Sequence, residues 1–199
     1  MNVLVACEES QRVCIEFRKR GHMAFSCDLK DCSGGFPEWH IKADCIKVIN
    51  ENEWDLIIAF PPCTYFSRMN FLNYYRNGKF NEKRFAKAQY YVKLFNDIWN
   101  AKCDRICIEN PVPMNIFNNL LPQYSMTLQP WEFGEEYSKK TCLWLKNLPP
   151  LIPTLISIEH KPLITVSNSF EKYKTIEEQS TWRSKTFQGV ARAMATQWG

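Results

Sequence analysis

The chain of 199 residues lacks the features that mark membrane, secreted and zinc-cluster proteins. No run is long and apolar enough to span a bilayer, and the N-terminus has neither the basic nor the apolar region of a signal peptide. There are nine cysteines, but the chain has no C-x-x-C pair and no His or Cys cluster that would complete a tetrahedral ligand set. We therefore expect a cytoplasmic protein with reduced cysteines, no bound metal and no membrane contact.

Glycine is scarce as well, with seven in the whole chain, and the dinucleotide-binding fingerprint GxGxxG is absent. This removes the usual sequence signature of a nucleotide-binding turn. It does not remove a strand, turn and helix that could hold a cofactor. The apolar content of 45% is sufficient for one well-packed domain, so we expect residues 1–199 to form a single domain.

Hydrophobic periodicity predicts an α/β fold with a mostly parallel sheet. A short apolar strand, an amphipathic helix and a second strand open the chain, and this order favours parallel pairing. The predicted strands are residues 3–6, 23–27, 55–58, 105–111, 125–129 and 141–145, with the last two as a candidate hairpin. The predicted helices are residues 11–20, a stretch that follows Asp44, residues 81–101 and a final helix that reaches Trp198.

Two of these strands run into prolines beside a chemically active side chain. Cys63 follows Pro61 and Pro62 at the end of one strand, and Glu109 lies near the end of another, followed by Asn110 and Pro111. Proline cannot donate to a strand ladder, so each strand stops there. Ligands of open α/β sheets bind at this carboxyl edge. The alternatives are a buried structural thiol at Cys63 and a solvated strand end at Glu109.

The sequence Pro-Pro-Cys-x-x-Phe-Ser resembles the catalytic motif of the DNA cytosine-C5 methyltransferases, and Glu-Asn-Pro resembles that family's Glu-Asn-Val motif. The resemblance implies a Rossmann-like class I methyltransferase fold with an antiparallel last strand. It implies transfer of a methyl group from S-adenosyl-L-methionine to C5 of cytosine in DNA. In that reaction Cys63 adds to C6, and Glu109 binds N3 and the exocyclic amine and helps to protonate N3.

The resemblance also implies where the cofactor binds. Asp28, at the end of the second strand, takes the ribose hydroxyls, and Asp44 contacts adenine while also being placed to cap the following helix. Glu8 lies in a first turn without glycine, where it either meets the positive end of the cofactor or is surface charge. The full predicted cofactor set is Ala6, Cys7, Glu8, Asp28, Asp44 and Pro61.

The predicted substrate contacts are Ser67, Arg68, Lys139 and Lys140. The family has an arginine-rich motif between the last two strands, and this chain has Lys139 and Lys140 in that place. Lysine lacks the planar fork of arginine, so a bidentate contact with the base is lost.

Positive charge is concentrated between residues 65 and 93, which carry seven basic residues and one acid, Glu82. Aromatic residues are interleaved with them, a mixture that suits contact with nucleic acid. The alternative is a solvated helix face with core aromatics. Residues 65–80 are too long for a plain connection, and the corresponding segment of the family is a mobile loop that closes over the flipped base.

Residues 149–182 are irregular and rich in proline, and they stand where the family inserts a much longer target-recognition domain. We therefore expect short or weak sequence preference. Three alternatives stay open: the same chemistry on single-stranded DNA, the same chemistry on a cytosine nucleotide, and a non-catalytic nucleic-acid-binding relic of the fold. The sequence leaves the oligomeric state open, with a homodimer among the options.

Overall fold

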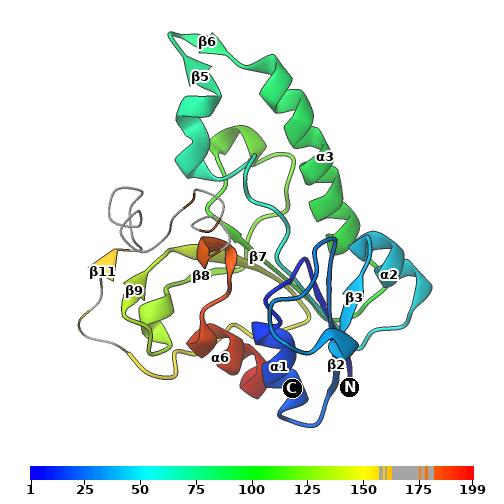
Figure 1. The fold of residues 1–199 in the computed structure, drawn as a ribbon. Helices are drawn as coiled ribbons and strands as arrows, with labels where there is room; N and C mark the ends of the chain where they lie inside the picture. The colour runs from blue at the N-terminus through cyan, green and yellow to red at the C-terminus, as the bar shows by residue number, and fades with distance from the viewer. Residues whose placement is uncertain (157–158, 160, 163–174, 176–177, 179–181) are drawn as a thin grey trace.

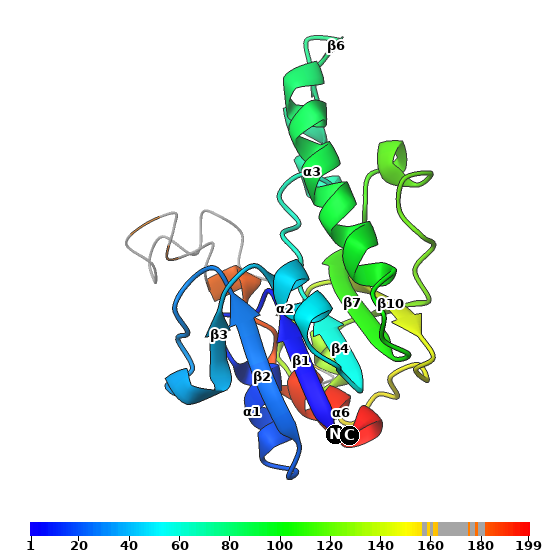
Figure 2. The same cartoon turned by 90° about the vertical axis from the view of Figure 1, so that its right-hand side faces the viewer.

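The computed structural model describes every residue except 157–158, 160, 163–174, 176–177 and 179–181. A seven-stranded sheet with the order β3-β2-β1-β4-β7-β10-β8 forms the centre, and helices lie on both of its faces (Figures 1 and 2). Its strands are β1 (Asn2–Ala6), β2 (Met23–Asp28), β3 (His40–Lys42), β4 (Leu56–Ala59), β7 (Ile106–Pro111), β8 (Met126–Leu128) and β10 (Thr141–Lys146).

The sheet is parallel from β3 through β7 and antiparallel where β10 pairs with β7 and β8. In register, Ala6 faces Ala59 and Ala59 faces Ile108, so β1, β4 and β7 end close together. This confirms the predicted α/β Rossmann-like architecture with an antiparallel strand late in the chain. The predicted pairing of the last two strands is also confirmed.

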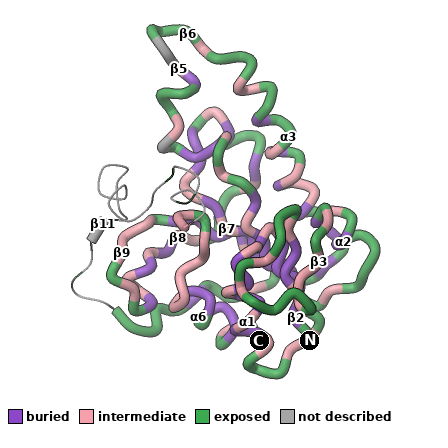
Figure 3. The backbone as a smooth tube through the Cα atoms, viewed as in Figure 1, coloured by how far each residue is buried: buried purple, intermediate pink, exposed green. Residues whose placement is uncertain are grey.

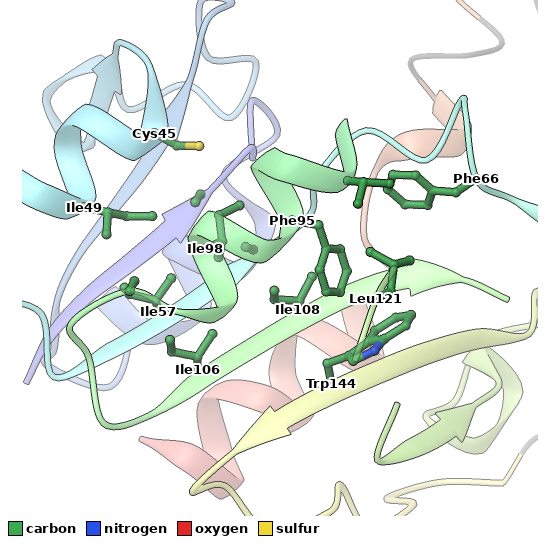
Figure 4. Packing of buried hydrophobic residues seen from close by; sticks show 14 of the residues in the cluster. Cys45, Ile49, Ile57, Phe66, Phe95, Ile98, Ile106, Ile108, Leu121 and Trp144 are labelled. Carbon is green, nitrogen blue, oxygen red and sulfur yellow. The ribbon is translucent and has the colours of Figure 1, made fainter. Parts of the chain in front are cut away.

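The helices divide between the two faces as the alternation of side chains along the strands requires. Val3 and Val5 of β1 pack with α1 (Arg12–Arg18) and α6 (Gln188–Trp198), while Leu4 and Ala6 face α2 (Cys45–Glu51) and α3 (Glu82–Trp99). Figure 4 shows the second cluster, in which Phe95 and Ile98 of α3 lie over the apolar side chains of β4, β7 and β10. Both clusters are almost fully buried, which anchors the strand ends that carry the site.

Short elements complete the described part of the chain. They are the 3-10 helices η1 (Pro37–Trp39), η2 (Arg68–Asn73), η3 (Asn115–Phe117) and η4 (Pro130–Glu132), and the strands β5 (Tyr75–Arg76), β6 (Lys79–Phe80), β9 (Tyr137–Ser138) and β11 (Lys161–Pro162). The predicted insertion at 149–182 lies largely outside the described residues.

Residues 65–80, here called the finger, form a folded projection. They contain η2 and the antiparallel β5–β6 pair, and together with the start of α3 they project beyond the sheet (Figures 1 and 3). Phe66 and Tyr74 are buried at its base, and Phe71 stacks on Tyr75 at a ring distance of 5.0 Å. The aromatics of this segment therefore pack largely against one another, which favours the alternative of core aromatics over free stacking platforms.

Within the described residues, every helix is too short or too polar to cross a membrane. The same residues contain no group of three or more His, Cys, Asp or Glu side chains arranged to hold a metal ion.

Candidate active site

The carboxyl edge of the sheet has its switch point between β1 and β4. From β1 the chain builds outward through β2 and β3 on one side, and then returns to add β4 and β7 on the other. The chain leaves β1 and β4 toward opposite sides of this point, and open α/β sheets bind ligands outside the carboxyl ends of such strands. The turn after Ala6 and the loop after Ala59 flank the switch point, and these are the segments in which Cys7 and Cys63 lie.

The loop that holds Cys63 begins as soon as β4 ends. Phe60 still donates its backbone N–H to the carbonyl of Ala6 at 3.0 Å, and the two prolines then stop the ladder. Pro61 is buried and Pro62 is exposed, so the first proline of the turn packs in the interior and the second faces solvent. The Cys63 carbonyl accepts from Ser67 N–H at 3.1 Å, and this tight turn leaves the Cys63 residue half-buried.

Glu109 lies in β7, the strand beside β4, and is also half-buried. The hydroxyl of Thr141, from β10, donates to its Oε1. Among the residues that the structure describes, Oε2 has no hydrogen-bond partner. One carboxylate oxygen is therefore held by the sheet, while the other is free to accept from or donate to a ligand.

The two proline-stopped segments are joined to each other. The buried Asn110 side chain donates from Nδ2 to the Pro61 carbonyl at 2.7 Å. Farther on, Arg68 N–H donates to the Val112 carbonyl at 2.9 Å, and Met114 N–H donates to the Phe66 carbonyl at 2.8 Å. These bonds keep the Cys63 and Glu109 loops in a fixed relation, so the structure brings together the two residues predicted to be catalytic.

The surroundings of Cys63 favour its neutral thiol. Burial raises the pKa of Cys63, and the nearby Glu109 carboxylate raises it further, while Lys139 and Arg183 act in the opposite direction. The thiol form therefore predominates at neutral pH. A reaction that uses the thiolate must remove this proton as the substrate binds.

Arg183 is the residue that the sequence reasoning missed as part of the site. Its carbonyl accepts from Lys139 Nζ at 2.9 Å, and its charge reaches Cys63. A guanidinium from the segment that leads into α6 therefore acts on Cys63 together with Lys139. No local spacing in the sequence links position 183 to position 139, because the contact depends on how the chain returns across the sheet.

The predicted substrate residues fall into two settings. Ser67 is buried and pairs with Pro113 in an isolated bridge, whereas Arg68 is exposed. Lys139 is half-buried and Lys140 is exposed. A cavity of about 20 Å³, the size of a single water, lies beside Lys139. It is lined by Glu109, Leu128, Pro130, Lys139, Thr141, Ser184, Thr186, Phe187 and Val190.

Glu8 is fixed by the first helix. Its side chain is 3% exposed, and its two oxygens accept from the backbone N–H groups of Val13 at 2.8 Å and Cys14 at 3.2 Å. The alternative of surface charge is therefore wrong. Burial raises the pKa of Glu8 to about 7, and the two backbone hydrogen bonds only partly offset this effect. A cofactor contact for this side chain stays a prediction.

Asp28 and Asp44 lie at the ends of their elements as predicted. Asp28 is half-buried and accepts from Lys30 N–H at 2.9 Å through Oδ1. Asp44 is exposed and accepts from Ile46 N–H at 2.8 Å, which confirms it as the N-cap of α2. In each case the bond uses one carboxylate oxygen, so the other can accept from ribose hydroxyls or an adenine amine. These two hydrogen-bond acceptors therefore fit the nucleoside part of S-adenosyl-L-methionine.

Cys7 occupies the place where the resembled family has glycine. Its φ of 57° lies in the left-handed region, which costs a side-chain-bearing residue energy that glycine would not pay. Its Sγ lies 3.7 Å from that of Cys45, the first residue of α2. The first turn thus reaches the geometry of a glycine-bearing turn without glycine, and the contact with α2 helps to hold it there.

Comparison with known proteins supports the fold. No family model and no curated protein sequence matches the chain. Among solved structures, an Entamoeba histolytica methyltransferase matches with a TM-score of 0.51 and 16% identity, over 81% of this chain and 57% of that chain. Weaker similarities are to a Spodoptera frugiperda DNMT2 mutant (TM-score 0.42, 18% identity, 82% and 55%) and an Escherichia coli rRNA methylase (0.40, 14%, 73% and 57%).

The class that the fold defines is therefore an α/β Rossmann-like domain, a fold that the chain shares with the Entamoeba histolytica methyltransferase. The chain spans little more than half the length of the structures that it matches.

Proposed function

We propose that the protein is an S-adenosyl-L-methionine-dependent methyltransferase that acts on C5 of cytosine in DNA through a covalent adduct at Cys63. The observation that carries this proposal is the junction of the two proline-stopped segments. Asn110 bonds to Pro61, and this holds the Cys63 loop beside Glu109 at the carboxyl edge of β4 and β7. A thiol and a carboxylate so placed suit addition to a pyrimidine ring with proton donation to its N3.

The reaction assigns a defined role to each side chain. Cys63 loses its proton, and the sulfur electron pair forms a bond to C6 of cytosine. Glu109, through the oxygen that Thr141 leaves free, binds N3 and gives it a proton, so the electrons of the C5–C6 double bond become available at C5. After C5 has gained the methyl group, a base removes the C5 proton. The electrons of that C–H bond then restore the C5–C6 double bond and expel the Cys63 sulfur, and N3 returns its proton to Glu109.

When bound, S-adenosyl-L-methionine supplies the electrophilic methyl group. The free oxygens of Asp28 and Asp44 would hold its nucleoside. Ala6, Cys7 and Pro61 would flank it at the switch point between β1 and β4. The side chain of Glu8 contributes to the site by fixing the start of α1.

The alternative of a non-catalytic relic is favoured by one observation, since the Glu8 carboxylate is already used by the backbone of α1. Calorimetric titration with S-adenosyl-L-methionine separates the two functions, because a relic that has lost its cofactor site would give no binding heat.

The decisive experiment uses an oligonucleotide in which 5-fluorocytosine replaces the target base. Fluorine at C5 cannot be removed as a proton, so wild-type protein with cofactor should form a stable adduct whose mass includes the transferred methyl group. The Cys63→Ala variant should form none. Cys32→Ala, which changes another half-buried free thiol, should form the adduct as the wild type does. Wild-type methyl transfer by Cys63→Ala would contradict the mechanism.

A further inference from the structure

The finger and the first turns of α3 enclose an open groove of about 840 Å³. Figure 1 shows the two elements side by side at the far end of the molecule from the chain termini. The groove is lined by Tyr65, Leu72, Asn73, Tyr75, Asn77, Asn81, Lys83, Arg84 and Lys87. This volume is far larger than that of the water-sized cavity beside Glu109. It lies in the range of volumes typical of pockets that bind small ligands.

The charged residues that line this groove are all cations. Lys83 and Lys87 are exposed and lie four residues apart, so they share one face of α3. Among the described residues, no carboxylate lies within 4.0 Å of either ammonium group, whereas Lys93 on the same helix pairs with Asp97 at 2.5 Å. The positive charge in the groove is therefore uncompensated, and an anionic ligand would be attracted to it.

The rest of the lining carries hydrogen-bonding but uncharged groups. Asn73, Asn77 and Asn81 are exposed, but the Asn81 amide caps α3 and bonds to the Asn73 carbonyl, and Asn73 Nδ2 donates to Asn70 Oδ1 at 3.2 Å. The Asn77 amide and the Asn73 side-chain oxygen are therefore the groups that can meet the edge of a nucleobase. Leu72 adds apolar surface at 79% exposure. Lysines for phosphates together with amides for base edges match a polynucleotide, which presents both kinds of group at regular spacing.

The inner end of the groove adjoins the nucleophile. Tyr65 is two residues from Cys63, and Arg84 donates from Nη2 to the carbonyl of Thr64 at 2.7 Å. The Arg84 guanidinium lies 4.9 Å from the centre of the Tyr65 ring, and Tyr65 also stacks on Tyr91 at 4.7 Å. Both faces of Tyr65 are therefore occupied, so bases in the groove would be read at their edges.

We propose that this groove binds a single-stranded stretch of polynucleotide next to the target cytosine, so that the finger and α3 take the place of a separate recognition domain. This inference rests on the proposed function, because it sets a nucleic-acid strand beside Cys63. A groove of this volume accommodates a few unstacked nucleotides, whereas a duplex requires a much wider surface. A base that reaches Cys63 must in any case leave its stack, so the nucleotides beside it are the ones that enter the groove.

Fluorescence anisotropy with labelled oligonucleotides tests the proposal without any requirement for catalysis. The probes are a single-stranded DNA with one cytosine, the RNA of the same sequence and the DNA annealed to its complement. The test variant is Lys83→Gln/Lys87→Gln. The matched control is Lys47→Gln/Lys93→Gln, which also removes two exposed helix lysines but from ion pairs with Glu51 and Asp97.

Wild-type protein should bind at least one of the single strands more tightly than the duplex. The test variant should bind that strand about tenfold more weakly at roughly 0.1 M salt, and the slope of log K against log salt should fall by about 1.4 for two lost phosphate contacts. The control should bind as the wild type does. Tighter binding of the duplex, or equal losses in both variants, would overturn the assignment of the groove.

The experiments distinguish an error in the assignment of the groove from an error in the proposed function. If labelled cofactor gives no methylated product with any cytosine substrate, while the test variant still loses strand binding, the enzyme assignment fails and the groove stands. If methyl transfer proceeds and the test variant binds strands as the wild type does, the enzyme assignment stands and the groove fails.

Discussion

The two halves of the carboxyl edge use their acidic side chains in different ways. The cofactor corner comprises the first turn, the end of β2 and the start of α2. Its acids Glu8, Asp28 and Asp44 all accept from backbone N–H groups. In the catalytic corner, formed by the ends of β4 and β7, Glu109 is held by one side-chain hydroxyl. The carboxylates of the cofactor corner thus satisfy backbone donors, whereas Glu109 pairs with a side-chain hydroxyl.

This difference predicts how each corner responds to substitution. Removal of a carboxylate that satisfies backbone N–H groups leaves those donors without a partner, so stability should fall. Removal of a group with a free oxygen should chiefly affect a ligand. Substitutions in the catalytic corner should therefore change rates at nearly constant stability, and those in the cofactor corner should change stability.

The largest expected effect is at Cys63. Cys63→Ala removes the nucleophile and should abolish methyl transfer, because C5 of cytosine does not become reactive without addition at C6. The residue is half-buried and the substitution removes a single sulfur atom, so the free energy of unfolding should change by less than about 1 kcal/mol. Transfer of label from the cofactor and urea unfolding measure the two quantities. Cys32→Ala is the control, and a large loss of stability in Cys63→Ala alone would show that the thiol is structural.

The next effect is at Glu109. Glu109→Gln preserves the shape and can still accept from Thr141, but it cannot give a proton to N3. The rate constant should fall at least about tenfold, since a general acid typically supplies 10²–10⁴-fold. Glu136→Gln, at an exposed position between the last two strands, should keep the wild-type rate. An unchanged rate constant in Glu109→Gln would make Glu109 an ordinary strand-end residue.

Much of the fold was predictable because it depends on local patterns. The short continuous apolar run of β1, which is buried on both faces, and the apolar faces of α1 and α3 can be recognised in the sequence, and the order of elements favours a parallel sheet. The finger was not predictable in this way. Its two-residue strands are too short to show a period, and its order comes from contacts such as the hydrogen bond from Tyr74 Oη to the Tyr65 carbonyl at 2.6 Å.

The candidate site divides along the same line. Cys63 and Glu109 could be found because each follows a strand and carries a recognisable neighbour in sequence. Arg183 could not, since its approach to Lys139 joins segments that are distant in the chain. The two hydrogen bonds that backbone N–H groups of α1 donate to Glu8 could not be predicted either. An acid before a helix can be a surface charge, a ligand contact or a cap. Only burial separates these options.

The pH dependence of stability should reveal Glu8. In the folded protein its pKa is about 7, above the ordinary value of 4.5, so the folded state holds a proton that the unfolded state has lost between these values. The contribution of Glu8 to the free energy of unfolding is therefore fully present below pH 4.5, and it is lost as the pH rises through 7. Relative to Glu8→Gln, wild-type protein should lose roughly 2–3 kcal/mol of unfolding free energy between pH 5 and pH 8. Glu53→Gln, at an exposed position that does not act on Glu8, should follow the wild type. Parallel curves for all three proteins would show that Glu8 does not titrate in this range.

The smallest effect is at Asp44, where the structural role as a helix cap can be separated from cofactor binding. Asp44→Ala removes the N-cap of α2 and should cost about 1 kcal/mol of unfolding free energy. Asn81→Ala removes the corresponding cap of α3, where Asn81 Oδ1 accepts from Arg84 N–H at 3.0 Å, and should cost a similar amount. If the second oxygen of Asp44 also binds the cofactor, calorimetry should show S-adenosyl-L-methionine bound about three- to tenfold more weakly by Asp44→Ala only. Equal cofactor affinity in the two variants would restrict Asp44 to its structural role as the N-cap of α2. Substitution of this cofactor-corner acid would then affect stability alone.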